Sequence, residues 1–559
     1  MRSTRWPRLL GWLAWVVAAG VPLLFLLVFF GWPMAALVAR GFLSEAGLEL
    51  SGLTDVATTR TWRVVALTLA QAAAGTLVAV LLGIPGAYLL YRRQFPGRAL
   101  VRVIVVTPFV LPTVVVGVAF RALLAPSGLL GGLGLDGSMI AVVAALVFFN
   151  YAVVVRVVGG LWERLDPRPA EAARSLGASR WRAWCTVTLP MLAPAIASAA
   201  SVVFLFCSTA FGVVLILGGP GYHTIETEIW LQTTQFLNLR AAAVLSVLQL
   251  VLVAVVLGVA GRLRTRQQRA LALAGVSSVV RRLRWRSGAD WTDLAAVTVT
   301  AVVVVGLLLT PMIHLLAASL RTATGWGLGN YVALGSTGGP NALSVTVWQA
   351  MEISIRTAID ATLLAVVIGV LVAVVLSRRP ASAAGHRAVA VMDALFMLPL
   401  GVSAVTVGFG FLITLNRPPL DLRSSLILIP IAQAVVAIPL VVRTVLPVLA
   451  AIDPRQREVA AVLGASPARV LWTIEGPYLA RALGLAAGFA FAVSLGEFGA
   501  TAFLARPDRP TLPVVIVRLL GQPGQENYGM ALAGAVVLAV LTGSVMAVAE
   551  RLRTAGPTW

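Results

Sequence analysis

Twelve long apolar stretches constrain the fold of this 559-residue chain more than any other feature. A helix needs roughly 20 mostly apolar residues to cross a bilayer, and each stretch reaches about this length. Only 12% of the residues are charged, against about 25% in soluble domains. The sequence therefore predicts an all-α polytopic membrane protein with about twelve transmembrane helices. The stretches are 9–38, 62–91, 98–124, 138–163, 191–217, 241–261, 291–318, 352–377, 384–415, 424–450, 479–504 and 529–549.

The distribution of arginine orients these helices. The net charge is +21, and the arginines gather at the N-terminus "MRSTRWPR", at the tail "ERLRTAGPTW" and in alternate connections, whereas the connection "APSGLLGGLGLDGS" has none. Short cytoplasmic loops of membrane proteins carry such an excess of positive charge. We therefore expect both termini in the cytoplasm. The charge orients the protein among membrane lipid and does not indicate a nucleic-acid partner.

A polar segment occurs twice. "EAARSLGASRWRAWCTVTLP" begins at Glu171 and "EVAAVLGASPARVLWTIEGP" begins at Glu458, an offset of 287 residues. The same offset relates Pro112 to Pro399, Arg156 to Arg443, Asp166-Pro167-Arg168 to Asp453-Pro454-Arg455, Phe211-Gly212 to Phe498-Gly499, and Thr224 to Thr511. The chain is thus a tandem duplication. We expect a first six-span transmembrane unit over 1–261, a basic cytoplasmic linker over 262–290 and a second unit over 291–559, with the substrate passing between the two.

Local chemistry predicts the shape of the repeated segment. Asp166 suits the N-cap of a helix, and Gly177 suits the left-handed position that follows a last helical residue. We expect a helix over 167–176, a tight turn, and a second helix from Ser179. The second copy repeats the pattern with Asp453, Pro454, Gly464 and Pro477. Two such elements on the cytoplasmic face suit a partner with two-fold symmetry.

The repeated segment resembles the EAA loop of permease subunits in ABC importers. The first copy matches through Glu171, Ala172, Ala173, Gly177, Leu189 and Pro190; the second keeps Glu458, Ala460, Gly464 and Pro477 but has Val459 and Gly476. In that family the short helix couples the permease to an ATPase subunit. The resemblance implies this role for 166–180 and 453–467. It implies as partners two copies of an ABC ATPase subunit and an extracytoplasmic solute-binding protein, which we expect to dock around 219–240 and 505–527.

Other stretches bear on the cargo. Two permease halves in one chain resemble the thiamine and ferric-iron permeases, and "YRRQFPGR", "ALVFFN" and "GYHTIETEIW" are similar to the thiamine branch. "SLGEFGATAFL" resembles a signature shared by iron, thiamine, molybdate and sulfate permeases. The resemblance implies a small-solute importer, with thiamine favoured over ferric iron and with an oxyanion or another small solute as alternatives.

The chain contains no lysine, so the Gly-x4-Gly-Lys-Ser/Thr loop that binds ATP phosphates is impossible. No zinc-helix or nucleophile motif is present either. We therefore expect a transport subunit that is not an enzyme and binds no cofactor or metal, with ATP used by partner subunits. A polytopic membrane enzyme would need a catalytic cluster in one large loop, and an ion-driven carrier would leave the repeated segments unexplained.

Three residues at membrane depth are candidates for the translocation path. Glu497 lies within an apolar stretch, where a charge must face the interior of the bundle. It is either a ligand for a cationic cargo or a structural contact, with Arg443 or a backbone group. Phe211 and Phe498 are related by the repeat and are candidates for a gate, although ordinary packing explains them equally well.

Overall fold

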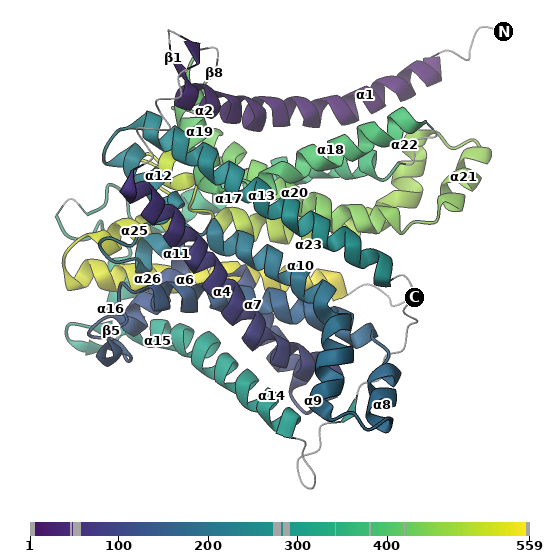
Figure 1. Ribbon diagram of the computed structural model, residues 1–559. Coiled ribbons are helices and arrows are strands. Elements are labelled where there is room, and N and C mark those ends of the chain that lie inside the picture. Colours follow the sequence, from purple (N-terminus) through teal and green to yellow (C-terminus); the bar gives the residue numbers. More distant parts are fainter. Residues whose placement is uncertain are drawn as a thin grey trace. The chain divides into compact units, whose positions relative to one another are not determined.

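The computed structural model describes residues 6–44, 47–48, 58–271, 281–282, 291–340, 342–378, 382–418 and 420–554. These ranges are mostly helical (Figure 1). Ten helices among them are long and apolar enough to cross a membrane, and the number rises to twelve if each of two bent helix pairs is one span. This confirms the expected all-α polytopic fold with about twelve transmembrane helices. The bent pairs are Arg98–Val110 with Thr113–Leu124 and Trp472–Ala480 with Ala482–Gly496.

The chain folds into two compact units that do not follow its sequence halves. The unit that we call the C-unit contains Met1–Gly52, Gln232–Val244 and Thr322–Trp559, and the N-unit contains Leu53–Leu231 and Leu245–Arg321. Each unit thus includes the first span of the other sequence copy. The division expected from the repeat, with boundaries after residues 261 and 290, differs from this one. Residues 272–280 and 283–290 of the expected linker lie outside the described residues.

The N-unit is built around α4 and α7, with α10 and α14 packed against α4. Its elements, followed in Figure 1, are α4 (Thr59–Arg92), β3 (Arg93–Gln94), α5 (Arg98–Val106), η2 (Thr107–Val110), α6 (Thr113–Leu124), η3 (Gly131–Leu133), α7 (Met139–Arg164), α8 (Arg168–Ser175), α9 (Arg180–Ala183), η4 (Trp184–Thr188), α10 (Leu189–Ser208), α11 (Gly212–Leu217), most of α12 (Ile225–Thr234) and of α13 (Leu239–Leu271), β4 (Arg281–Arg282), α14 (Trp291–Val302), η5 (Val303–Leu309) and α15 (Thr310–Ser319).

The C-unit is built around α17, α20 and α23, with α1 against α17 and α2 against α19. Its elements are α1 (Trp6–Leu26), η1 (Leu27–Gly31), α2 (Trp32–Phe42), β1 (Leu43–Ser44), β2 (Gly47–Leu48), β6 (Gly325–Trp326), α16 (Gly329–Ala333), α17 (Val347–Leu376), α18 (Ala383–Gly401), α19 (Ala404–Thr414), β7 (Asn416–Arg417), β8 (Leu420–Asp421), α20 (Leu428–Ala450), α21 (Pro454–Val462), α22 (Pro467–Val470), η6 (Leu471–Glu475), α23 (Gly476–Gly496), α24 (Thr501–Leu504), α25 (Leu512–Gly521) and α26 (Gln525–Thr554). Strand β5 (Arg321–Thr322) lies at the boundary of the units and pairs with β6.

Side-chain caps mark where several helices begin. The hydroxyl of Ser138 accepts a hydrogen bond from Ala141 N at the start of α7. At the start of α17, Thr346 and Gln349 form a reciprocal capping box. These contacts satisfy backbone donors that have no partner within their own helix. They fix the helix ends at the borders of the apolar stretches.

The two central helices of the N-unit approach closely because small residues face large ones. A side chain at Gly86 of α4 would collide with the ring of Tyr151 in α7, since an added Cβ would lie 2.9 Å from its Cζ. At Gly159 of α7 an added Cβ would meet the ring of Tyr91. These positions require glycine for packing. The α4–α7 pair is therefore the rigid centre of this unit.

The fifth span of the first copy is interrupted after Ser208, and the interruption frees backbone carbonyl groups. Gln71 Nε2 donates to the carbonyl of Cys207 at 2.8 Å, and Gln249 Nε2 donates to that of Ser208 at 3.2 Å. Both glutamines are buried. Unsatisfied backbone groups are costly in an apolar medium, so these two side chains stabilise the break before α11.

Candidate functional site

The first repeated segment forms the expected helix, turn and helix. Helix α8 begins at Arg168, whose N–H donates to Asp166 Oδ1 at 3.0 Å. Gly177 has a φ of 89°. Gly177 N donates to Arg174 O and Ala178 N donates to Ala173 O, both at 3.0 Å. These two bonds form a Schellman motif, which ends a helix through a left-handed glycine. The expected helix, turn and second helix are thereby confirmed.

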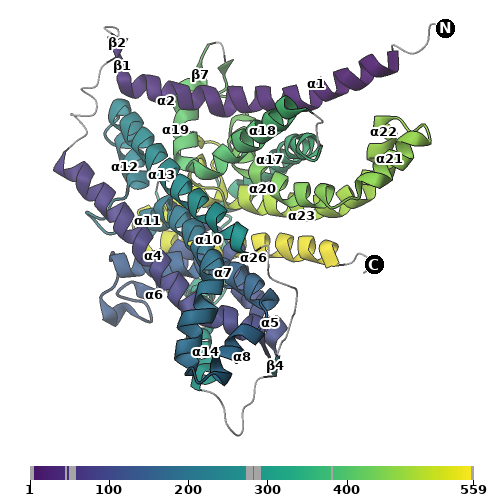
Figure 2. The same ribbon diagram turned by 45° about the vertical axis from the view of Figure 1, so that its right-hand side comes forward.

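The second segment has the same geometry. The N–H of Arg455 donates to Asp453 Oδ1 at 2.9 Å. Gly464 has a φ of 82°, and Ala465 N donates to Ala460 O at 2.9 Å. Figure 2 shows α21 and α22 as a helical hairpin at the end of α20 and α23. The two repeated segments therefore share one turn geometry. The backbone carbonyl groups of Ala173 and Ala460 accept the hydrogen bond that closes each turn.

The 287-residue register extends beyond the repeated segments. α9 and η4 map residue for residue onto α22 and η6, and α12 maps onto α25. In α12 and α25, the first backbone N–H donates a hydrogen bond to a hydroxyl group of the second span of the same copy. Ile225 N donates to Thr68 Oγ1 at 3.0 Å, and Leu512 N donates to Ser354 Oγ at 2.7 Å. The duplication is therefore structural and includes the short helices that follow the fifth span.

Each turn exposes a large apolar side chain that our sequence analysis did not single out. Leu176 is 88% exposed and Leu463, its equivalent, is 80% exposed. Glu171 and Glu458 are exposed one and a half turns earlier in the same helices. Single exposed apolar side chains are common on protein surfaces, so the distinguishing feature of these two leucines is that they recur at equivalent places on both hairpins. The signal was the leucine inside the repeated Leu-Gly-Ala-Ser core, although sequence alone does not give its exposure.

A buried carboxylate holds the second hairpin, and this residue was also missed. The side chain of Glu475 in η6 is 0% exposed. Its Oε1 lies 2.7 Å from Arg457 Nε and 2.8 Å from Arg378 Nη1, and Oε2 lies 3.1 Å from Arg378 Nη2. Arg457 belongs to α21, and Arg378 follows the transmembrane helix α17. The cluster therefore joins the hairpin to a membrane span.

Near the first hairpin, the buried carboxylate belongs to Asp293 of the membrane helix α14 and not to the hairpin itself. Asp293 of α14 accepts hydrogen bonds from Tyr88 Oη at 2.7 Å and from Arg93 Nη2 at 2.8 Å. Burial lowers the pKa of Arg93, but its interactions with Tyr88 and Asp293 outweigh burial, and the pKa lies above its ordinary value. These contacts join α14, which belongs to the second sequence copy, to α4 within the N-unit.

The carboxylate of Glu497 is bound by its own chain. Its Oε1 accepts from Ala500 N at 2.7 Å, and its Oε2 accepts from Thr501 N at 3.1 Å and from Thr501 Oγ1 at 2.7 Å. Glu497 is buried, and these bonds satisfy the first donors of α24. Arg443, the other contact considered, is exposed, and its Nε lies 3.2 Å from Met397 Sδ. The geometry favours the structural interpretation of Glu497, whose role in transport stays a prediction.

Phe211 and Phe498 lie at equivalent breaks in the fifth span of each copy. Phe211 is 6% exposed between α10 and α11, and Phe498 is 4% exposed between α23 and α24. Both side chains are buried. Their proposed role as a gate stays a prediction.

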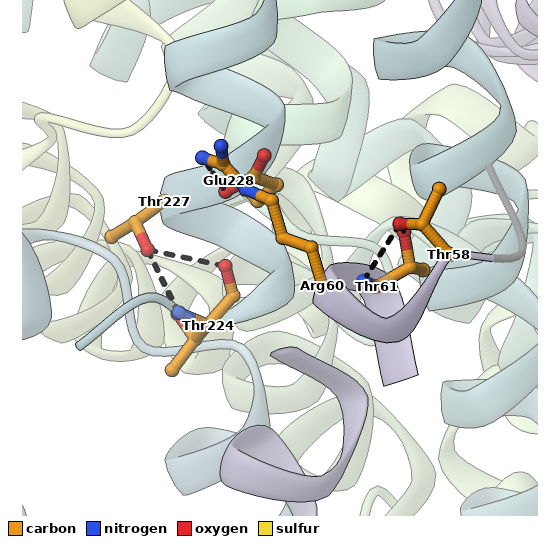
Figure 3. A network of polar contacts seen from close by, with 6 residues as sticks. All are labelled: Thr58, Arg60, Thr61, Thr224, Thr227 and Glu228. Carbon is orange, nitrogen blue, oxygen red and sulfur yellow. Dashed lines mark hydrogen bonds and ion pairs between the residues drawn. The ribbon is translucent and has the colours of Figure 1, made fainter. Parts of the chain in front are cut away.

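A further polar network lies where α4 begins beside α12 (Figure 3). Arg60 Nη2 donates to Glu228 Oε2 at 3.0 Å, and Glu228 is buried whereas Arg60 is half exposed. Thr227 Oγ1 accepts from Thr224 N at 2.9 Å at the start of α12. Thr224, Thr227 and Glu228 belong to "GYHTIETEIW", so the acidic residue Glu228 of this stretch contributes to the contact between α12 and the start of α4.

Among the described residues, no group of three or more His, Cys, Asp or Glu side chains could hold a metal ion. Cys185 and Cys207 are unpaired thiols. The two hairpins, with their equivalent turns and exposed leucines, are the candidate functional site.

The chain is similar to known proteins over segments that include the hairpins. Residues 75–268 match the family described as "Binding-protein-dependent transport system inner membrane component". The chain is 26% identical over 562 residues to the "Thiamine transport system permease protein ThiP" of Brucella abortus (strain 2308), covering 96% of this chain and 95% of the relative. It is 27% identical to the protein of the same name from Escherichia coli (strain K12), covering 88% and 89%. The "Sulfate transport system permease protein CysT" of Escherichia coli (strain K12) is 29% identical over 42% of this chain and 86% of its own length.

Proposed function

Because this chain belongs to the permease subunits of ABC importers, with two permease halves in one polypeptide, we propose that its two hairpins dock two copies of an ATPase subunit. The first docking element comprises α8, the turn at Gly177 and α9, and the second comprises α21, the turn at Gly464 and α22. Closure of the ATPase subunits on ATP moves both elements. The membrane spans then open alternately to the two sides of the membrane. ATP drives this change because the contacts between the ATPase subunits and the hairpins differ between the two states.

The observation that supports this proposal best is the exposed leucine at each turn. Leu176 and Leu463 occupy equivalent places on equivalent hairpins, and both are at least 80% exposed. Burying a leucine side chain that is exposed in the free protein contributes about 1.5–3 kcal/mol. Two identical apolar tips suit two identical grooves. Glu171 and Glu458 then contribute exposed charged contacts at the edge of each interface.

We also propose that the ATPase site belongs entirely to the partner. The chain has no lysine, and phosphate-binding loops of ATPases use one to reach the β- and γ-phosphates. This permease therefore binds no cofactor of its own. Its contribution is a solute path and a mechanical link.

On the opposite side, an extracytoplasmic solute-binding protein is expected to dock around 219–240 and 505–527. These segments contain α12 and α25, which map onto each other in the repeat. This orientation places both termini in the cytoplasm, in agreement with the arginine distribution. The membrane is the inner membrane of a bacterial cell.

We infer that the cargo is thiamine. The proteins named as thiamine permeases align with 88–96% of this chain, whereas the sulfate permease aligns with less than half of it. Ferric iron is the second candidate because the "SLGEFGATAFL" stretch is similar in both groups. The bonds of Glu497 to its own backbone support a structural role for this residue rather than contact with the cargo.

A direct uptake assay tests the cargo. Cells of the native host that lack this chain are compared with complemented cells for uptake of labelled thiamine, ferric iron and sulfate. Restored thiamine uptake alone supports the proposal. Restored iron or sulfate uptake with unchanged thiamine uptake contradicts the thiamine proposal and leaves the docking proposal intact.

A further inference from the structure

A cavity of about 420 Å³ lies in the N-unit, on the side of α8 that faces the membrane helices. Its walls come from α8, α9 and η4 of the first hairpin and from the ends of α4, α7 and α14. Figure 1 shows α8 and α9 at the end of the N-unit where α14 begins. Leu176, the proposed contact for the ATPase, does not line this cavity. The cavity is therefore distinct from the leucine at the tip of the hairpin, and Glu171 is among the residues that line it.

The cavity changes from polar to apolar along the membrane helices. Arg92 lines it at the end of α4, and Ile84 lines it about 12 Å deeper in the span, given 1.5 Å per residue. In α14, Trp291 lines the cavity at the start of the helix, and Val299 lines it about 12 Å deeper in the span. An amphiphile with a polar group at the membrane surface and an apolar body within the membrane fits this gradient.

Aromatic side chains form one wall. The rings of Tyr88 and Trp162 have centroids 5.4 Å apart, and those of Trp162 and Trp184 lie 5.3 Å apart. Trp181 and Trp291 also line the cavity, and both are more than 60% exposed. Tryptophan is enriched where lipid headgroups meet the hydrocarbon. The aromatic wall therefore indicates that the cavity lies at the depth of the lipid headgroups.

The charges of the cavity favour an anion. Asp293 does not line the cavity but pairs with Arg93, so these two charges cancel, and the other charged lining groups are three arginines and two carboxylates. The excess of one positive charge matches a monoanionic ligand. The charged groups that line the cavity are Arg92, Arg93, Arg174, Arg180, Asp166 and Glu171.

The other copy of the repeat fills the corresponding place with its own side chains. Ala170 and Thr188 line the cavity, and their equivalents at the 287-residue offset are Arg457 and Glu475, which form the buried ion pair of the second hairpin. Arg174 corresponds to Ala461. The first copy thus has small residues where the second has its ion pair, and an arginine where the second has an alanine.

We propose that this cavity binds the headgroup of an anionic phospholipid from the leaflet on the hairpin side. The phosphate occupies the region near Arg174 and Arg180, and the rest of the headgroup extends toward Ala170 and Thr188, where the second copy has its ion pair. One acyl chain follows Ile84 and Val299. Basic pockets among transmembrane helices recognise anionic headgroups in this way. The lipid joins the first hairpin to α4 and α14, as the Glu475 cluster joins the second to α17.

Native mass spectrometry of the purified full-length chain tests this proposal without the ATPase. The protein is titrated with phosphatidylglycerol or phosphatidylcholine of the same acyl composition. We expect one phosphatidylglycerol to be retained preferentially. The double variant Ala170→Arg, Thr188→Glu copies the ion pair of the second hairpin into the cavity and is expected to abolish this preference. Its thermal unfolding, measured in parallel, reports whether the variant is folded.

A charge variant and its control provide the second arm. Arg174→Gln removes a charged donor from the cavity, and loss of such a hydrogen bond weakens binding by about tenfold or more. Arg168→Gln changes an arginine of the same helix that does not line the cavity and should leave the preference unchanged. Equal retention of the two lipids by the native chain, or an undiminished preference in the folded double variant, would overturn the proposal. Displacement of the lipid by equimolar inorganic phosphate would contradict a lipid as the ligand.

Discussion

Glu475 Oε1 lies 2.7 Å from Arg457 Nε, so a fully buried carboxylate in η6 holds the second docking element by its helix α21. The same carboxylate binds Arg378 after α17. One side chain thereby connects α21 to a membrane span. The first element has Thr188 at the equivalent position. The two docking elements share their backbone geometry and differ in how they are joined to the membrane helices.

Glu475→Gln should therefore destabilise the chain. Removing one partner of a buried ion pair costs about 3–5 kcal/mol, and the partial exposure of Arg378 and Arg457 places the expected loss at the lower end. The midpoint of thermal unfolding and the uptake rate, normalised to membrane level, measure it. Thr188→Val, at the equivalent position of the first hairpin, is the control and should have a smaller effect. An unfolding midpoint equal to that of the native chain in Glu475→Gln would refute the role of the cluster.

The turn glycines give a second prediction. Gly177→Val and Gly464→Val should uncouple transport because a β-branched residue is strained at positive φ, by roughly 1–2 kcal/mol. An added Cβ has nothing within 4 Å at either site, so the effect comes from the backbone alone. Asn, which tolerates this conformation, should retain more uptake than Val at both positions. Gly160→Val, at an uncrowded helical glycine, is the control. Normal uptake by both valine variants would contradict the account of the turn.

Glu497 gives a third prediction. Glu497→Gln should largely preserve uptake, because an amide oxygen still accepts a bond from the start of α24. Glu497→Leu should lower the amount of folded protein, since the donors Ala500 N and Thr501 N then lose a partner, at about 1–3 kcal/mol for a buried group. Membrane level and uptake are measured together. A Glu497→Gln protein that is inactive yet as abundant as the native chain would instead indicate contact with a cationic cargo.

The hairpins were predictable from sequence because their determinants are local. Asp166 and Gly177 act on backbone groups within a few residues, so their spacing alone fixes the helix and its turn. Glu475 was missed because its partners Arg457 and Arg378 lie 18 and 97 residues away. The exchange of first spans was missed for a related reason: α1 and α14 carry apolar surfaces whose partners no local pattern specifies. Leu176 is part of the repeated motif, but its exposure depends on what else packs around the turn.

The acidic residues of the EAA-like segments give a fourth prediction. Glu171→Ala and Glu458→Ala each remove an exposed charge, and exposed ion pairs contribute about 0.2–1 kcal/mol. Each single variant should retain most of the ATPase during purification, whereas the double variant should lose a measurable share, with the largest difference from the native chain at low salt, where exposed charges are least screened. Full retention by the double variant at low salt would argue against docking through these glutamates.

The most direct test of the central claim is the amount of P-loop ATPase that co-purifies with the chain when both exposed leucines are changed. The double variant Leu176→Asp, Leu463→Asp is tagged, expressed in the native host and purified from its membranes, and ATPase polypeptides containing a P-loop are quantified by mass spectrometry. Leu129→Asp, Leu133→Asp changes two exposed leucines in the connection between α6 and α7 and is the matched control. We predict that the ATPase is lost from the first variant and retained by the control, at equal membrane levels of the chain. Retention of the ATPase at the native level by Leu176→Asp, Leu463→Asp would contradict docking through the two hairpins.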